Sequence, residues 1–149
     1  KAVEIPLLHI ADATAAAVIA ASLHRVGLIG TRFTMEEPFY RDRLAERHGL
    51  AVLVPYAGER ETLHRVIYGE LCRSEIRAES RAAFAAIARG LIARGAQGLI
   101  LGCTEVGLLL GPGDVAVPLF DTARLHAEAA ARHALPDRRP ADHGSSVAR

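Results

Sequence analysis

The sequence predicts an α/β fold with a mostly parallel β-sheet that is covered by helices on both faces. Short apolar segments alternate along the 149 residues with longer amphipathic, alanine-rich segments, and this alternation is typical of parallel strands joined by helices. Residues 98–101 (Gly-Leu-Ile-Leu) are continuously apolar, as expected of a strand buried on both faces. Hydrophobic residues make up 50% of the chain, which is enough for one globular domain with a substantial core.

The N-terminal part predicts a strand, a helix and a second strand. Residues 5–10 (Ile-Pro-Leu-Leu-His-Ile) have the apolar character of a strand. Asp12 and Thr14 are candidate N-caps of an alanine-rich helix that runs to about Leu23. Residues 26–31 (Val-Gly-Leu-Ile-Gly-Thr) then form the second strand. The helix between the two strands is the connection that parallel strands need.

A helix and a third strand follow. Thr34 and Glu37 have the spacing of a capping box, which predicts the start of a helix that ends at Gly49. Residues 50–54 are expected to form the third strand, and Pro55 stops it because proline has no backbone N–H to donate.

Two amphipathic helices are expected before the strand at 98–101. Gly58 marks the turn before the first of them. The second begins near Ser74 or Glu79 and ends at Arg94, with Gly95 as its C-terminal stop. The apolar residues at core spacing are Leu63, Val66, Ile67 and Leu71 in the first helix and Phe84, Ile87, Ala88, Leu91 and Ile92 in the second.

The C-terminal part predicts one more strand and one more helix. Residues 111–113 (Gly-Pro-Gly) form a turn, and residues 115–120 form the last strand. Asp121 or Thr122 caps a final helix that runs to Leu135, before a proline.

Several predicted strands end at residues that could contribute to a binding or catalytic site. Thr31, Pro55, Cys103 and Asp121 each fall at the carboxyl end of one of the five predicted strands, and in an open parallel sheet the ligand crevice lies at these ends. If residues 105–110 are helical, their free N–H groups and the helix dipole lower the pKa of the Cys103 thiol. Cys103 is therefore a candidate nucleophile or a base that removes a proton from carbon.

The loop at residues 30–34 (Gly-Thr-Arg-Phe-Thr) is a candidate anion cradle. The N–H groups at a helix start, the hydroxyls of Thr31 and Thr34 and the Arg32 guanidinium all suit a carboxylate. The alternative is that the threonines only cap the helix and Arg32 is solvated. The segment lacks the third glycine of the dinucleotide motif, and a Walker lysine is absent, so we do not expect nucleotide binding.

Charge and hydropathy argue against several classes of partner. The net charge is +1 and the arginines are dispersed, so we expect no nucleic-acid partner. No apolar segment is long enough to cross a membrane and no secretory signal is visible. Cys72 and Cys103 are far apart in sequence, which favours a reducing, cytoplasmic setting, and we interpret Cys72 as a structural thiol.

No cofactor is expected. Lys1, at the very start of the chain, is the only lysine, so a Schiff-base lysine for pyridoxal phosphate is missing. The histidines lack the short ligand spacings of zinc sites, and we expect no metal and interpret all of them as surface or capping groups. They are His9, His24, His48, His64, His126, His133 and His143.

Five ordered segments resemble the aspartate/glutamate racemase family, in particular its amino-acid racemases that include aspartate racemase. They are residues 5–10, 30–34, 79–83 (Glu-Ser-Arg-Ala-Ala), 102–105 (Gly-Cys-Thr-Glu) and 118–122 (Pro-Leu-Phe-Asp-Thr). The resemblance covers essentially everything from Lys1 to Leu135, and Gly-Cys-Thr-Glu at a strand end is its most specific part.

The resemblance implies a cofactor-independent amino-acid racemase that places two cysteines on opposite faces of the substrate α-carbon. One thiolate removes the proton and the other thiol returns one. Cys103 would be the cysteine of the C-terminal domain. Thr31 and Thr34 would hold the α-carboxylate, Thr104 would donate in the same crevice and Arg32 would meet a side-chain carboxylate. The residues expected to bind substrate are Thr31, Arg32, Thr34, Thr104 and Glu105.

The same resemblance implies a domain organisation. Residues 1–24 would be the end of the N-terminal racemase domain and a crossover helix, residues 25–135 the C-terminal domain, and residues 136–149 a disordered tail. The N-terminal domain with the first cysteine is missing, and the chain starts almost inside a predicted strand. We therefore expect a fragment that is inactive alone, from a full-length protein that forms homodimers and racemises an acidic or broadly chosen amino acid.

Two alternatives stay open. Decarboxylases of malonate-like acids in the same superfamily keep a single cysteine at the corresponding strand end and use it to reprotonate their product. In a non-catalytic α/β binding module, Cys103 would be packed and Thr31 would only cap a helix. The substrate, the enantiomer preference and the oligomeric state do not follow from the sequence.

Overall fold

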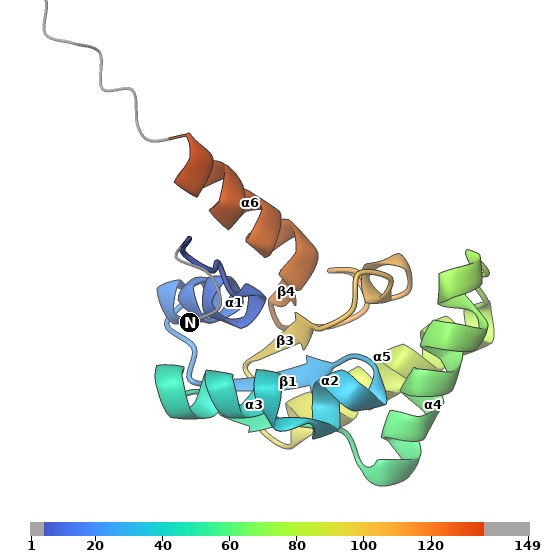
Figure 1. The fold of residues 1–149 in the computed structure, drawn as a ribbon. Coiled ribbons are helices and arrows are strands. Elements are labelled where there is room, and N and C mark those ends of the chain that lie inside the picture. The colour runs from blue at the N-terminus through green and yellow to red at the C-terminus, as the bar shows by residue number, and fades with distance from the viewer. Residues whose placement is uncertain (1–4, 136–149) are drawn as a thin grey trace, which may run out of the picture.

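The structure, a computed structural model, describes residues 5–135 and is built on a four-stranded parallel sheet (Figure 1). The strand order is β2-β1-β3-β4, and every neighbouring pair is parallel. The strands are β1 (Arg25–Ile29), β2 (Ala51–Leu53), β3 (Gly98–Leu101) and β4 (Leu119–Asp121). The predicted α/β class is therefore confirmed. The tail predicted at residues 136–149 lies outside the described residues.

Helices cover both faces of the sheet. The α-helices are α1 (Ile10–Ala20), α2 (Arg32–Glu36), α3 (Pro38–Asp42), α4 (Ala57–Gly69), α5 (Ala78–Ala93) and α6 (Thr122–Ala134). A Cβ placed on Gly27 would meet Leu91 of α5, whereas one on Gly98 would meet Leu23, which follows α1. Because Gly27 pairs with the residue after Gly98, the two glycines face opposite sides, and α1 and α5 cover different faces (Figure 1).

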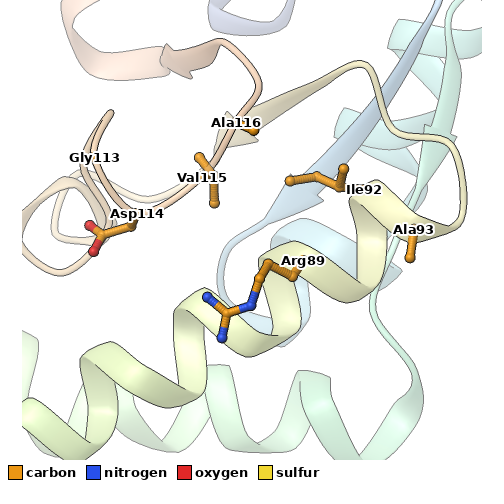
Figure 2. A pocket seen from close by; sticks show the side chains of 7 residues that line it. All are labelled: Arg89, Ile92, Ala93, Gly113, Asp114, Val115 and Ala116. Atoms are coloured by element: carbon orange, nitrogen blue, oxygen red, sulfur yellow. The ribbon is translucent and has the colours of Figure 1, made fainter.

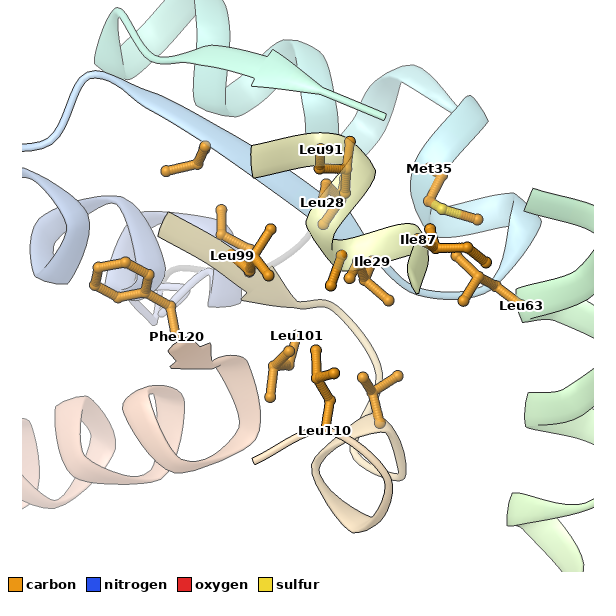
Figure 3. Packing of buried hydrophobic residues seen from close by; sticks show 14 of the residues in the cluster. Leu28, Ile29, Met35, Leu63, Ile87, Leu91, Leu99, Leu101, Leu110 and Phe120 are labelled. Atoms are coloured by element: carbon orange, nitrogen blue, oxygen red, sulfur yellow. The ribbon is translucent and has the colours of Figure 1, made fainter. Parts of the chain in front are cut away.

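The core consists of buried apolar residues of β1 and β3 and of the helices on both faces of the sheet, α1 and α5 among them. All four residues of β3 are buried, as its continuous apolar sequence predicts. The predicted apolar faces of the two connecting helices are also buried, apart from the partly buried Ile92. Figure 3 shows the packing of buried side chains around the sheet, including Leu28, Leu91, Leu99, Leu101 and Phe120.

The first helix begins in a different way from the one predicted. Residues 5–9 form no strand, and the N-cap is His9, whose Nδ1 accepts a hydrogen bond from the Ala11 N–H at 3.1 Å. Asp12 and Thr14 are thus not caps, because both side chains are used inside the fold. Thr14 is buried, donates to the Ile10 carbonyl at 2.9 Å and accepts from a tyrosine on α3. The helix ends at Ala20, three residues before the predicted end.

The helix predicted from Thr34 to Gly49 is broken into three. Thr31, not Thr34, caps α2, and Glu37 starts α3 because Pro38 has no N–H to continue the first helix. A π-helical turn, η1 (Arg43–Arg47), follows α3. Gly49 ends this region as predicted, with a φ of +68° that favours glycine.

Two further predictions on element boundaries need correction, and the predicted start of the last helix is confirmed. Gly58 lies inside α4 and marks no turn. The Glu59 carboxylate instead starts this helix, by accepting from the Tyr56 N–H at 2.8 Å. The last strand is limited to β4, and residues 115–118 are outside it. The final helix α6 is capped by Asp121, one of its two predicted caps, through a 3.0 Å bond from the Arg124 N–H.

An ion-pair cluster joins α1 to the π-helical turn. The Arg43 guanidinium donates two hydrogen bonds of 2.7 Å to Asp12, and His48 lies 2.9 Å from the same carboxylate. The hydrogen bonds from Arg43 are the main reason why the pKa of Asp12 lies well below its usual range. An ionised Asp12 thus stabilises the fold, and this contribution decreases when acid protonates it.

We expect Asp12→Asn to lower the free energy of unfolding at pH 7 by about 1–2 kcal/mol, because Arg43 loses its charged acceptor. The folded-state pKa is depressed, so the contribution is complete above the ordinary carboxyl pKa of about 4 and decreases as the pH falls below it. Urea denaturation at pH 7 and pH 3 measures both effects. Asp42→Asn, which removes an exposed pair with Arg41, is the matched control. A destabilisation by Asp12→Asn that is equal at both pH values would contradict the prediction.

Candidate functional site

The carboxyl ends of three strands meet at one edge of the sheet. Ile29 at the end of β1 pairs with Leu101 at the end of β3, and Leu101 pairs with Asp121 of β4. The Gly102 N–H donates to the Ile29 carbonyl at 2.7 Å, and the Thr122 hydroxyl donates to the Leu101 carbonyl at 2.8 Å. These bonds fix the start of the loop that carries Cys103. β2 is shorter, and its last residue, Leu53, pairs with Gly27, two residues before the end of β1. Pro55 therefore follows a strand that ends short of this edge.

The threonine loop lies against the start of the Cys103 loop. Thr31 and Thr34 contact each other through their hydroxyl oxygens at 3.2 Å, and the Thr34 N–H donates to the Thr31 hydroxyl at 3.4 Å. A Cβ on Gly102 would lie 3.0 Å from the Thr34 methyl group, and one on Gly30 would lie 3.2 Å from the Thr34 Cβ. The two glycines thus allow α2 to approach the end of β3, which places Thr34 against Gly102, the residue before Cys103.

Arg32 faces a different part of the molecule. Its guanidinium lies 3.7 Å from the Glu61 carboxylate of α4, and its backbone N–H donates to His64 Nδ1 at 3.3 Å. The side chain also lies over the ring of the exposed Phe33. In this structure the predicted cradle is therefore divided: the hydroxyls lie beside the Cys103 loop and the guanidinium lies beside α4.

A hydrogen-bonded group surrounds the thiol of Cys103. The half-buried Cys103 Sγ donates to Glu105 Oε2 at 2.9 Å, and the Thr104 hydroxyl donates to the same oxygen at 2.6 Å. These two donors lower the pKa of Glu105, which is therefore ionised at neutral pH. The thiol proton is thus directed at a carboxylate two residues further along the chain.

The expected lowering of the Cys103 pKa is wrong. Burial first, and the hydrogen bond to Glu105 second, raise the pKa of the thiol to about 12. The physical reason is local: residues 105–110 form only a single 3₁₀ turn, η3 (Val106–Leu108), instead of a helix. A thiol without a helix start beside it has no dipole to stabilise its thiolate, and the neighbouring carboxylate opposes that charge.

Glu105 is in contact with the thiol, a relationship that the sequence reasoning missed when it assigned this residue to substrate binding. The signal was present in the Cys-x-Glu spacing, since residues two apart in a tight turn contact each other easily. Asp121, the last residue of β4, lies at the same edge and uses its carboxylate to cap α6.

Cys72 and the histidines take positions outside this group. Cys72 is exposed in a short 3₁₀ turn, η2 (Leu71–Arg73), which contradicts its interpretation as a packed structural thiol. His9 caps α1, and His126 Nε2 lies 3.0 Å from the Leu8 carbonyl. Within residues 5–135, no group of three or more His, Cys, Asp or Glu side chains is arranged to hold a metal ion. No helix in the same range is long and apolar enough to span a membrane.

A hollow of about 570 Å³ lies elsewhere, between α5 and residues 113–116 (Figure 2). Its lining is mostly apolar, with Ile92 and Val115 on opposite sides and the charged groups of Arg89 and Asp114 at one end. Neither Cys103 nor Glu105 lines it. The candidate active site is therefore the edge of the sheet at Cys103 rather than this hollow.

Comparison with known proteins identifies the family. The profile of the Asp/Glu/Hydantoin racemase family matches residues 1–130. The chain is 49% identical to a candidate Asp/Glu racemase from Yersinia pestis, whose crystal structure it matches with a TM-score of 0.85 over 87% of this chain and 56% of that one. It is 35% identical to an aspartate racemase homologue from Pyrococcus horikoshii OT3, with a TM-score of 0.80 over 89% of this chain and 57% of that one.

A third structure shares the fold alone. The aspartate racemase of Picrophilus torridus is 18% identical and matches with a TM-score of 0.60 over 82% of this chain and 52% of that one. The chain thus spans slightly more than half the length of these proteins. Because the family profile matches most of its residues, this chain belongs to the Asp/Glu/Hydantoin racemase family.

Proposed function

We propose that this chain is the C-terminal half of a cofactor-independent amino-acid racemase, acting on aspartate, glutamate or a broader range of amino acids. The observation that carries the proposal is the Cys103 thiol, hydrogen-bonded to an ionised Glu105 at the carboxyl end of β3. The family and its racemase-like structures support the same conclusion. The rest of the protein, here called the other half, would supply the second cysteine. Together the two halves are called the full-length protein.

The chemistry follows from the protonation state of Cys103. With its pKa raised to about 12, the thiol is protonated at neutral pH and serves as a proton donor. The S–H bond breaks as the electron pair on the substrate α-carbon takes the proton, and the thiolate that forms is held in the site. In the opposite direction this thiolate removes the α-proton. Its high pKa makes it a strong base, as a weakly acidic α-proton requires.

The threonine loop is suited to hold the substrate. Thr31 and Thr34, together with the N–H groups at the start of α2, offer donors to an α-carboxylate beside the Cys103 loop. A substrate side-chain carboxylate that reached Arg32 would share the guanidinium with the exposed Glu61 carboxylate, which lies 3.7 Å away.

A second candidate function is decarboxylation of a malonate-like acid. A thiol with a raised pKa is also what an enzyme needs to protonate the carbanion left when CO₂ departs. The two functions differ in whether a second cysteine faces Cys103 across the substrate. That cysteine would lie in the other half of the protein.

Proton exchange at Cα in D₂O tests the proposal directly. The full-length protein is expected to exchange the α-proton of aspartate, glutamate or other amino acids, as measured by ¹H NMR, and to invert their configuration, as measured by optical rotation. The 149-residue chain alone is expected to do neither, because it supplies only one cysteine at this site. Release of CO₂ from malonate-like acids without Cα exchange of amino acids would instead establish the decarboxylase.

Two further properties belong to the same proposal. We expect the full-length protein to form homodimers in solution, which light scattering after size exclusion measures. A reducing, cytoplasmic setting suits an enzyme whose thiols must stay free, in agreement with the two unpaired cysteines of the described chain.

A further inference from the structure

The Glu-Ser-Arg segment at the start of α5 has no role in the proposed chemistry, yet it contacts the loop that follows Cys103. Arg81 donates through one guanidinium nitrogen to Asp114 Oδ2 at 3.2 Å and through the other to the Leu108 carbonyl at 3.2 Å. These partners are 33 and 27 residues away in sequence. A single side chain of α5 thus holds two points of one loop.

The loop passes this restraint on to Glu105. The Leu108 N–H donates to the Glu105 carbonyl at 3.0 Å, so the residue whose carbonyl Arg81 holds is part of the turn that begins at Glu105. At the other end, Asp114 Oδ2 also accepts from the Gly111 N–H at 2.8 Å, which closes the turn at residues 111–114. Arg81 therefore fixes the loop at both ends, and the Glu105 side chain contacts the Cys103 thiol from within it.

Arg81 itself stands on a rigid base. The neighbouring Ser80 is buried and donates to Glu70 Oε2 at 2.5 Å, which joins the first turn of α5 to the end of α4. Asp114 is partly buried, with a side-chain exposure of 24%, and borders the hollow shown in Figure 2. The ion pair is thus held by ordered elements on both sides, which is the condition for a side chain to position a neighbouring loop.

We propose that Arg81 is a positioning residue for the racemase site: by holding the loop from Glu105 to Asp114, it keeps the Glu105 carboxylate against the Cys103 thiol. The inference rests on the proposed function, because the protonated thiol is the proton donor there. It assigns a role to a residue that touches neither the thiol nor the place of the substrate.

The charges around Cys103 make the sign of the effect informative. Glu105 is the main neighbour, Cys72 adds a weak repulsion, and Asp121 approaches the loop at Gly107. If Arg81 acted only through its own positive charge, removing it would make the thiol harder to ionise. If it acts by positioning, removing it lets Glu105 move away, and the thiol becomes easier to ionise.

Alkylation of Cys103 as a function of pH separates these possibilities. Iodoacetamide reacts with the thiolate, and mass spectrometry of the Cys103 peptide reports this site alone in the full-length protein. We expect Arg81→Ala to move the midpoint of the pH profile down by about one unit or more, which gives roughly tenfold faster labelling below the midpoint. Glu105→Gln is expected to shift the midpoint in the same direction, and adding Arg81→Ala to it is expected to produce little further shift.

Two variants guard against a general loss of stability. Arg81→Lys keeps the positive charge but lacks the forked guanidinium that reaches both partners. A downward shift of the midpoint in this variant therefore has no Coulombic origin. If Arg81→Ala does not fold, Arg81→Lys provides the test. Arg60→Ala is the matched control, because Arg60 also joins a carboxylate, Glu36, to a carbonyl, Pro55, both at 2.7 Å. Arg60→Ala is expected to lower the melting temperature without moving the midpoint.

An unchanged or raised midpoint in a folded Arg81 variant, or full additivity with Glu105→Gln, would overturn the inference. Failure of the proposed function is recognised separately: Cα exchange would then survive Cys103→Ser, whatever Arg81 does. If Cys103→Ser abolishes exchange while Arg81→Ala leaves the pH profile in place, only the role of Arg81 is wrong.

Discussion

Cys103→Ser is expected to lower Cα proton exchange by the full-length protein by about 10²–10⁴-fold, the usual contribution of a positioned acid or base. Serine has nearly the size of cysteine, and Cys103 is only half-buried, so the fold should persist. A hydroxyl is a much weaker acid than a thiol, and its conjugate base is not accessible near neutral pH. The loss should therefore appear in kcat more than in KM, because the Thr31–Thr34 loop is unchanged.

Cys72→Ser is the matched control for this experiment. Cys72 is an exposed thiol in η2, so its replacement is expected to leave exchange at the wild-type rate. Equal losses in the two variants would indicate that free thiols matter for some other reason. Exchange that survives Cys103→Ser would remove Cys103 from the mechanism.

Glu105→Gln is expected to make Cys103 more reactive toward iodoacetamide, by about 10- to 100-fold near pH 8, since each pKa unit changes the thiolate fraction about tenfold. The carboxylate raises the pKa of the thiol both by accepting its proton in a hydrogen bond and by repelling the thiolate. Glutamine removes the charge and keeps the length. Burial, the largest cause, stays, so the pKa should decrease only part of the way to the value of about 8.5 of a free cysteine.

The same variant should impair the proton-donor role, because the Cys103 thiol loses the carboxylate that orients its proton. Glu61→Gln provides the control: this carboxylate pairs with Arg32 on α4 and is expected to leave Cys103 labelling unchanged. Slower labelling in Glu105→Gln would show that the carboxylate assists ionisation of the thiol, in contradiction to the geometry at Sγ.

The elements that the sequence predicts well are those whose burial decides their structure. β3 is apolar at every position and is buried at every position. α5 buries its predicted stripe apart from the partly buried Ile92, and it ends at Ala93, shortly before Gly95, whose φ is +96°. The position of Cys103 follows from the end of β3 and from the parallel topology. These features depend on periodicity, which a single sequence displays.

Features that depend on competition between neighbouring groups were not predictable. His9, Asp12 and Thr14 all have side chains that are able to cap a helix. His9 caps α1 because Asp12 binds Arg43 and Thr14 binds Tyr40, and these two partners are distant in the sequence. The reversed pKa of Cys103 has a similar origin. Val106, Leu109 and Leu110 are all buried. Because the two adjacent leucines both pack into the core, the chain forms only a single 3₁₀ turn before them. The dipole expected from a helix therefore does not form.

The close packing of Thr34 against Gly30 and Gly102 has a practical consequence for engineering the substrate range of the protein. A Cβ at Gly30 would lie 3.2 Å from Thr34 and one at Gly102 would lie 3.0 Å from it, so Thr34 would have to shift, and random mutagenesis aimed at new substrates should hold both positions fixed. Diversity is better directed at the exposed Phe33 and Tyr68, whose rings both contact the ring of His64 at the surface.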